Sequence, residues 1–327
     1  MADTAQSHLP DSATSATGEP ELSAAVKPPA GRRVLHLDLG REMRGGQHQV
    51  LALMEGLRDL GVEQQLLTRA GSPLAIAALA RRFPVGDGGW RAVAAGSRWA
   101  DLVHAHCAAS HTRAALMASA PLVVSRRVAF PVGQDALSRW KYGRAHRYIA
   151  VSRHVFSLLL QAGIPRERLR VVHDGVPLLP PPDERRDIVA LSSNDPGKCN
   201  RLIQAAADLG HFPVVFARDL PAAFRHARLF VYLSTGEGLG SATLLALSAS
   251  IPVIATRLPA LAEVVDDGVC GLLVDNDPAE LATAVHRLLA SDSGAAAMGV
   301  RGRQRVESAF TNLRMVRQTL AVYEELW

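Results

Sequence analysis

Short apolar runs alternate with amphipathic stretches along most of the chain. In the first half, apolar runs that suit strands lie at residues 34–39, 64–68, 102–104, 122–125, 148–151 and 170–173. Between the first two, apolar residues spaced by threes and fours predict a helix from about Gln47 to Leu60, ended by Gly61. Ser152 is placed to cap a later helix that ends at Gly163. Strands that alternate with helices in this way predict an open parallel sheet.

The alternation resumes after the proline-rich stretch 177–182, which we interpret as an extended linker. Strands are predicted at residues 188–191, 213–216, 229–233, 252–255 and 271–274, and helices from about 241, at 278–290, at 295–308 and at 312–326. The sequence therefore predicts an α/β protein with two parallel sheets, each covered by helices on both faces.

Composition fits this division into two domains. The 327 residues are 48% hydrophobic and 20% charged, which supplies enough apolar surface for a core in each domain of a soluble protein. No apolar run approaches the roughly 18–20 residues of a membrane span, and the N-terminus lacks a basic-then-apolar signal pattern. Residues 1–31 are rich in small, polar and acidic residues, so we expect a disordered tail there.

Cysteine usage and charge say little about chemistry. Cys107, Cys199 and Cys270 are too scattered for a disulfide framework or a zinc motif, which favours the reducing cytoplasm. The net charge of +5 is modest and does not call for a nucleic-acid partner. The arginine cluster within residues 139–147 could bind an anionic substrate or an acidic membrane surface; a solvated helix face is the alternative.

The segment 231–277 carries the most specific pattern. An apolar strand is followed by a glycine-punctuated turn with one carboxylate, Glu237, and then by a helix that starts near Ser241. Ligands on parallel sheets bind beyond the carboxyl ends of the strands, where Glu237 falls. The backbone from Gly238 to Gly240 can approach a ligand closely, and the free N–H groups of the following helix, at Ser241 and Ala242, suit a diphosphate.

The order of motifs in this segment resembles the donor-site pattern of the family 4 retaining glycosyltransferases. E-G-x-G stands at 237–240, P-V-I-A at 252–255, E-V-V at 263–265, and G-L-L-V at 271–274. The resemblance implies the GT-B architecture of two facing Rossmann-like domains. One departure is clear: the second glutamate of the family pattern, eight residues after Glu237, is Leu245 here.

The resemblance extends to the first half of the chain. The loop L-H-x-D-x-G-R-x-x-R-G-G-Q at 35–47, H-A-H at 104–106, I-A-V-S at 149–152 and V-x-x-G-V at 172–176 are similar to the same family. In that family the glycine pair, here Gly45 and Gly46, lies against the donor phosphates and the acceptor. Arg126 and Arg127 stand near the position where many members carry a histidine. They could bind a phosphate or an acidic acceptor, but a guanidinium is no general base.

Two further residues are candidates for the reaction. The resemblance places Lys198, ahead of a helix, on the donor diphosphate, although the arginine that relatives often carry on the preceding strand is absent. A metal site on His104, His106 and His111 lacks a carboxylate or cysteine at zinc spacing, so we expect none. Instead we expect His104 to pack at the strand end and His106 to face the cleft.

The sequence thus predicts a GT-B glycosyltransferase with five segments: a tail at 1–31, an N-terminal acceptor-side domain at 32–176, a linker at 177–182, a shortened nucleotide-sugar domain at 183–310, and a last helix at 311–327 that crosses back to the N-terminal domain. The resemblance implies metal-independent transfer of a sugar, with retention, from a nucleotide-sugar donor to a hydroxyl of a glycan or lipid-linked saccharide. Catalysis would involve Glu237, Lys198 and His106. No cofactor is expected.

The expected setting is cell-envelope polysaccharide synthesis in the cytoplasm, with a peripheral contact at the inner face of the membrane. Two alternatives differ in class. A catalytically inactive GT-B homologue that binds a nucleotide-sugar or a partner protein would explain Leu245 and the short second domain. A dinucleotide-dependent enzyme would need G-x-G-x-x-G straight after the first strand, where Arg44-Gly45-Gly46 does not supply it.

Overall fold

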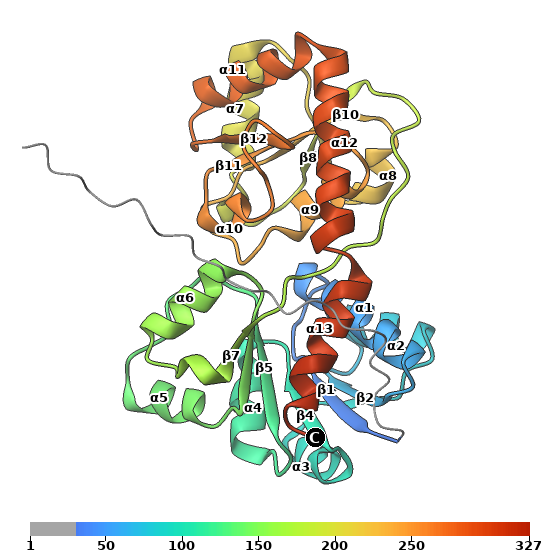
Figure 1. The fold of residues 1–327 in the computed structure, drawn as a ribbon, viewed down its shortest axis with the longest axis vertical. Helices are drawn as coiled ribbons and strands as arrows, with labels where there is room; N and C mark the ends of the chain where they lie inside the picture. The colour runs from blue at the N-terminus through green and yellow to red at the C-terminus, as the bar shows by residue number, and fades with distance from the viewer. Residues whose placement is uncertain (1–30) are drawn as a thin grey trace, which may run out of the picture.

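The computed structural model describes residues 31–327, so all but the last residue of the predicted tail lies outside the described residues. Two α/β units are stacked along the long axis of the molecule, and each contains one parallel sheet with helices on both faces (Figure 1). The predicted α/β class with two parallel sheets is confirmed. The predicted domain ranges 32–176 and 183–310 each enclose one of these sheets and stay predictions as boundaries.

The first sheet has seven strands in the order β3-β2-β1-β4-β5-β6-β7. Its strands are β1 (Arg33–Leu37), β2 (Glu63–Thr68), β3 (Val85–Asp87), β4 (Leu102–Ala105), β5 (Leu122–Arg126), β6 (Arg147–Ala150) and β7 (Leu169–Val171). Its helices are α1 (Gly45–Asp59), α2 (Pro73–Ala80), α3 (Trp90–Trp99), α4 (Ala108–Met117), α5 (Ala136–Gly143) and α6 (Arg153–Gln161), with a 3₁₀ turn at Arg166–Arg168. The predicted cap of α6 is confirmed, because the Ser152 side chain accepts a hydrogen bond from the N–H of Val155.

The second sheet has five strands in the order β12-β11-β10-β8-β9. Its strands are β8 (Asp187–Leu191), β9 (Val215–Ala217), β10 (Ala227–Tyr232), β11 (Val253–Thr256) and β12 (Gly271–Val274). Its helices are α7 (Asn200–Gly210), α8 (Leu220–Phe224), α9 (Ser241–Ser248), α10 (Pro259–Ala262), α11 (Pro278–Leu289) and α12 (Asp292–Ala309), and a 3₁₀ turn spans Pro196–Lys198. This sheet has two strands fewer than the first, and the shortening predicted relative to the family stays a prediction.

The last helix, α13 (Asn312–Glu324), leaves the second unit and packs against α1 of the first (Figure 1). Its buried apolar side chains, Val316 and Leu320 among them, join one cluster with Leu53 and Leu57 of α1. Gly56 permits this contact, because a Cβ there would lie 2.5 Å from a methyl of Val316. The chain therefore ends on the unit in which it begins.

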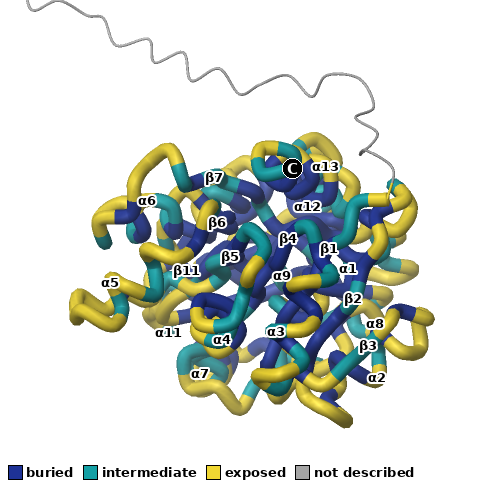
Figure 2. Tube along the Cα trace, turned by 90° about the horizontal axis from the view of Figure 1, so that it is seen from below, coloured by how far each residue is buried: buried dark blue, intermediate teal, exposed yellow. Residues whose placement is uncertain are grey.

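The inner strands of both sheets form the buried centre of the molecule, whereas the edge strands β3 and β9 and helix α5 have no buried residue (Figure 2). The largest cluster of buried apolar side chains includes Leu37 of the first sheet and Phe230 of the second, so the core runs through both units. Among residues 31–327, no helix combines the length and the apolar character that crossing a bilayer requires.

Strand order determines where a ligand can bind. In each sheet the order reverses once, between β1 and β4 in the first and between β8 and β10 in the second. Loops that leave the carboxyl ends of such neighbouring strands run in opposite directions and open a crevice between them. Gly45 and His106 follow β1 and β4, and Lys198 and Glu237 follow β8 and β10, so the predicted residues lie at these crevices.

Candidate active site

Lys198 and Glu237 meet at the crevice of the second sheet. The ammonium group of Lys198 donates to Oε1 of Glu237 and, at 2.6 Å, to the hydroxyl of Tyr232. That hydroxyl donates in turn to Glu237 at 2.6 Å. The side chains of Lys198 and Glu237 are 21% and 11% exposed, so the pair is mostly desolvated and still reachable from the crevice.

The turn after Glu237 ends in the N-terminus of α9. Gly240 caps this helix with φ +95°, a left-handed conformation that glycine adopts without strain, and its carbonyl accepts from the N–H of Thr243 and of Leu244. The first N–H groups of a helix have no intrahelical partner and lie at the positive end of its dipole. Ser241 and Ala242, both half-buried, occupy this position. These free N–H groups have the geometry that a diphosphate would require, and its binding here stays a prediction.

Glycines of both units meet across the crevice. A Cβ on Gly238 would lie 2.2 Å from the carbonyl oxygen of Arg127, and a Cβ on Gly45 would lie 3.5 Å from Oγ of Ser241. A Cβ on Gly46 would lie 3.7 Å from Cδ of Arg127. The structure thus brings the Gly45-Gly46 loop, Arg127 and the E-G-x-G turn together into one site.

Arg127 connects this site to a buried carboxylate. Its Nε donates to Asp174 at 3.1 Å, and its Nη1 lies 3.4 Å from Nδ1 of His106. Asp174 is 5% exposed and also accepts a hydrogen bond from the side chain of Ser241. Burial raises the pKa of Asp174, and the charge of Arg127 works against that shift. Arg126, in contrast, points away from the crevice and donates to the Tyr142 hydroxyl and the Phe130 carbonyl.

His36, His104 and His106 are packed together below the crevice. Nδ1 of His36 lies 3.0 Å from Nε2 of His106, and its Nε2 lies 3.0 Å from the amide oxygen of Gln64. His104 lies 2.6 Å from the hydroxyl of Tyr323, on α13, and 2.8 Å from the Ser125 hydroxyl. His106 is 5% exposed, so only its edge beside Arg127 is near the crevice.

Burial keeps these imidazoles neutral. Desolvation lowers the pKa of His36 to about 4, and desolvation with the nearby charge of Arg127 lowers the pKa of His104 and of His106 well below the usual value. One ligand atom from each of the three lies within 4.8 Å of the others, so they are the residues that could hold a metal. Each ring nitrogen, however, already has a protein partner, and coordination would break those contacts.

His111, the third residue of the metal site considered from the sequence, lies elsewhere. Its ring packs edge-on against Tyr142 and Tyr148. Burial lowers its pKa to about 3. His36 takes the place beside His104 because β1 and β4 pair in register at these two residues.

Glu263 links the two units on the far side of the site. Its carboxylate accepts from the backbone N–H groups of Arg153 and His154, at the N-terminus of α6, at 2.8 Å each, and from His173 at 3.2 Å. Burial raises its pKa, but these hydrogen bonds outweigh that effect and lower it overall. A carboxylate from one unit therefore caps a helix of the other.

Sequence reasoning missed three residues of the site: Tyr232, Asp174 and His36. Tyr232 ends a mostly apolar strand, and Asp174 is a carboxylate between a strand and a glycine. Both signals are present in the sequence but weak. Leu245 is half-buried on α9 and packs against the large apolar cluster, so the helix face that carries it is partly core.

Comparisons with known proteins agree with this fold. The model of the family Glycosyltransferase Family 4 matches residues 43–178, and that of Glycosyl transferases group 1 matches residues 165–291. The fold resembles the crystal structure of Anabaena Alr3699/HepE in complex with UDP-glucose, with a TM-score of 0.79 at 17% identity over 90% of this chain and 100% of that one. A glycosyltransferase from Rickettsia africae gives a TM-score of 0.76 at 15% identity over 90% and 98%.

Two facing parallel-sheet α/β domains define the GT-B class of proteins. Within that class, the first half of the chain is similar to Glycosyltransferase Family 4 and the second half to the group 1 glycosyltransferases. Relatives include a D-inositol 3-phosphate glycosyltransferase of Salinispora tropica, 39% identical over 131 residues. An alpha-maltose-1-phosphate synthase of Mycolicibacterium smegmatis is 36% identical over 107 residues. These matches span 38% and 31% of this chain and only 27% and 28% of the relatives.

Proposed function

We propose that the protein transfers a sugar, with retention at the anomeric carbon, from a nucleotide-sugar donor to a hydroxyl of a saccharide acceptor. The observation that carries the proposal is the meeting of Lys198 and Glu237 at one crevice with Gly45, Gly46 and Arg127 facing them from the other domain. Retention rests on the family resemblance alone.

The donor side would bind the diphosphate. Lys198 and the first N–H groups of α9 are fixed positive groups where negative charge develops as the sugar departs, and such preorganised groups lower the barrier to transfer. Glu237 would accept hydrogen bonds from sugar hydroxyls. To reach the diphosphate, the ammonium group of Lys198 must give up part of its contact with Glu237.

The acceptor side would be formed by Arg127, Asp174 and His106. Asp174 binds Arg127 and also contacts Ser241 of the donor domain. The contacts of this ion pair would therefore depend on whether the crevice is closed. The departing phosphate would take the acceptor proton, so the scheme needs no protein base. It also needs no metal, because Lys198 and the helix amides take over charge neutralisation.

The donor base and sugar can be found by screening. The solved neighbours include one bound to UDP-glucose, which makes UDP-sugars the first candidates. A ligand that binds only the folded protein raises its melting temperature, so we would compare UDP-, GDP- and ADP-sugars in a thermal-shift assay.

Glu237→Gln tests the assignment of catalysis. We expect transfer to fall at least about a hundredfold, which corresponds to about 2.7 kcal/mol of barrier, and stability to be impaired far less. Lys198→Met should weaken UDP binding by roughly 1.5–3 kcal/mol, the value of a charge-assisted hydrogen bond. Glu55→Gln, a surface carboxylate on α1, serves as the control. Glu237→Gln with wild-type kinetics would reject the proposal.

A binding protein without transferase activity is the second candidate, and Leu245 favours it. A leucine cannot accept the hydrogen bonds that the family glutamate makes with the donor. This candidate predicts a UDP-dependent rise in melting temperature without turnover of any donor and acceptor pair. Turnover that Glu237→Gln abolishes would rule it out.

For the acceptor, we propose a lipid-linked saccharide reached at the inner face of the membrane. Helix α5 and the loop before it expose Phe130, Leu137 and Trp140, at 71%, 72% and 43%, beside the cations Arg139 and Lys141. Apolar side chains flanked by cations match an anionic lipid surface. Flotation with phosphatidylglycerol vesicles tests this: binding should be lost in Leu137→Ser/Trp140→Ser, and equal binding of both proteins would contradict it.

A further inference from the structure

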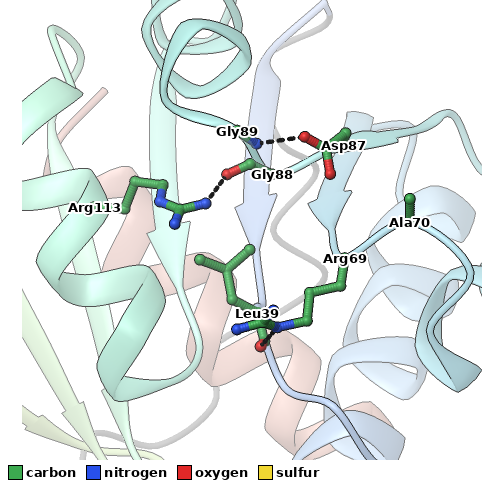
Figure 3. Close-up of a pocket in the computed structure, with 7 residues that line it drawn as sticks. All are labelled: Leu39, Arg69, Ala70, Asp87, Gly88, Gly89 and Arg113. Atoms are coloured by element: carbon green, nitrogen blue, oxygen red, sulfur yellow. Dashed lines mark hydrogen bonds between the residues drawn. The ribbon is translucent and has the colours of Figure 1, made fainter.

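A separate pocket of about 330 Å³ lies at the carboxyl edge of the first sheet, on the β2 and β3 side of β1 (Figure 3). It is lined by Leu39, Arg69, Ala70, Asp87, Gly88, Gly89 and Arg113. The volume is about ten times the roughly 30 Å³ that one water occupies in the liquid, and it reaches the lower limit of small-ligand pockets. A structural water alone does not explain a space of this size.

Arg113 reaches the pocket from α4 in a fixed orientation. It donates a hydrogen bond to the carbonyl of Gly88, and its guanidinium lies over the ring of Trp90 at 4.6 Å. Its Nε is buried and has no hydrogen-bond partner among the described residues. Because that nitrogen has almost no accessible surface, only the terminal nitrogens of Arg113 could contact a ligand in the pocket.

Arg69 reaches the same pocket from the end of β2. Its Nε donates to the carbonyl of Leu39 at 2.8 Å, which fixes the side chain beside Leu39 in the lining of the pocket (Figure 3). Within residues 31–327, neither Arg69 nor Arg113 has an acidic ion-pair partner. Both guanidinium groups line the same pocket, are anchored by backbone carbonyls and have hydrogen-bonding capacity to spare, a combination that suits an oxyanion.

The rest of the lining fits a polar ligand with one negative group. Asp87 is the single carboxylate of the lining, and its Oδ2 accepts from the N–H of Gly89 at 2.9 Å, which leaves its other oxygen able to accept from hydroxyls. Gly88 also lines the pocket. A Cβ at this position would lie 2.3 Å from Leu39, so a larger residue would displace the Leu39 side chain. Two cations against one anion give the pocket a net positive charge.

We propose that this pocket binds a phosphate or carboxylate group carried by the acceptor saccharide. That the anionic group belongs to an acceptor rests on the proposed function. Binding of an anion in the pocket does not depend on it. Leu39 follows β1 and leads directly into the loop that ends at Gly45, so the pocket and the transfer site open on the same edge of the sheet. The enzyme would therefore select an anionic sugar and present one of its hydroxyls to the donor.

The test is equilibrium binding by calorimetry, with glucose 6-phosphate, glucuronate and glucose as probes and UDP as the independent probe of the donor site. We expect glucose 6-phosphate, glucuronate or both to bind, and glucose not to bind. Arg113→Gln and Arg69→Gln should each weaken that binding at least tenfold and leave UDP binding unchanged. The control is Arg91→Gln, an exposed arginine of α3 outside the pocket.

Arg113→Lys controls for a folding defect, because lysine keeps the positive charge but lacks the planar guanidinium group. This variant should lose anion binding while its melting temperature stays near that of the wild type. Tighter binding of glucose 6-phosphate would indicate an acceptor that carries a phosphate. Tighter binding of glucuronate would indicate an acceptor that carries a carboxylate. No binding of either anion, or equal binding in wild type and Arg113→Gln, overturns the inference. Anion binding without UDP binding in the wild type would overturn the proposed function instead.

Discussion

Gly238→Ala adds a single methyl group at the narrowest contact between the two domains. The new Cβ would lie 2.2 Å from the carbonyl oxygen and 2.7 Å from the carbonyl carbon of Arg127, and 3.3 Å from Val151. The obstacle is backbone, so no side-chain rotation relieves the overlap. We therefore expect the substitution to hold the domains apart.

The structure sets the size of the effect. Ordinary contacts of a Cβ begin near 3.4 Å, so the turn or the facing loop must retreat by more than 1 Å from the observed 2.2 Å. A misplacement of about 1 Å between reacting groups can cost about a hundredfold in rate. We expect a fall in kcat/KM of that order. Stability should change little, because opening the crevice removes the overlap.

Gly236→Ala is the matched control, since it alters the same turn but its Cβ would meet nothing within 4 Å. Turnover, melting temperature and the radius of gyration from small-angle scattering with bound UDP would be measured for both variants. Gly238→Ala should lose activity and stay expanded with UDP bound, whereas Gly236→Ala should compact as the wild type does.

Two results would refute the reasoning. Wild-type activity in Gly238→Ala would mean that this contact is not part of the active arrangement. Equal losses in both alanine variants would mean that the turn needs glycine flexibility and that the domain contact is irrelevant. Arg127→Ala combined with Gly238→Ala should not restore activity, because the obstacle is the Arg127 carbonyl.

The remaining predictions concern α9 and the buried histidines. Leu245→Glu should fold, because Leu245 is only half-buried, and should tighten donor binding and increase discrimination against 2′-deoxyribose donors; a stable variant with unchanged nucleotide affinity would contradict this. His36 has a pKa of about 4 when folded and about 6.5 when unfolded, so below pH 6.5 the unfolded chain binds the extra proton and stability falls. From pH 7 to pH 5 the loss should be about 2 kcal/mol from His36 alone, at 1.36 kcal/mol per pKa unit. Urea unfolding should show a smaller pH dependence for His36→Gln.

Periodicity predicted most of the fold because most strands are apolar runs bounded by turns. The strand predicted at 271–274 is observed as β12, Gly271–Val274. Strand β3 was not predicted: its three residues, Val85–Asp87, include a glycine and follow a proline, so no alternation is visible. Strand β3 forms because it pairs with the edge of β2, a tertiary contact that periodicity does not reveal.

The contacts of the candidate site were harder to predict. The rule that ligands bind at the carboxyl ends of parallel strands placed Lys198 and Glu237 near a crevice, but 39 residues separate them. Their ion pair requires β8 and β10 to be neighbours, and no periodicity encodes strand order. Asp174 was overlooked for a related reason, since its partners, Arg127 and Ser241, come from two different domains.

Each cation of the crevice is paired with a carboxylate of the protein, Lys198 with Glu237 and Arg127 with Asp174. A donor diphosphate must compete with those carboxylates, so its affinity is the difference between two sets of charge-assisted hydrogen bonds. Removing a cation and removing its carboxylate should therefore shift nucleotide affinity in opposite directions. Glu237→Gln should bind UDP at least as tightly as the wild type while it transfers sugar poorly, and that combination distinguishes a catalytic carboxylate from one that merely shapes the site.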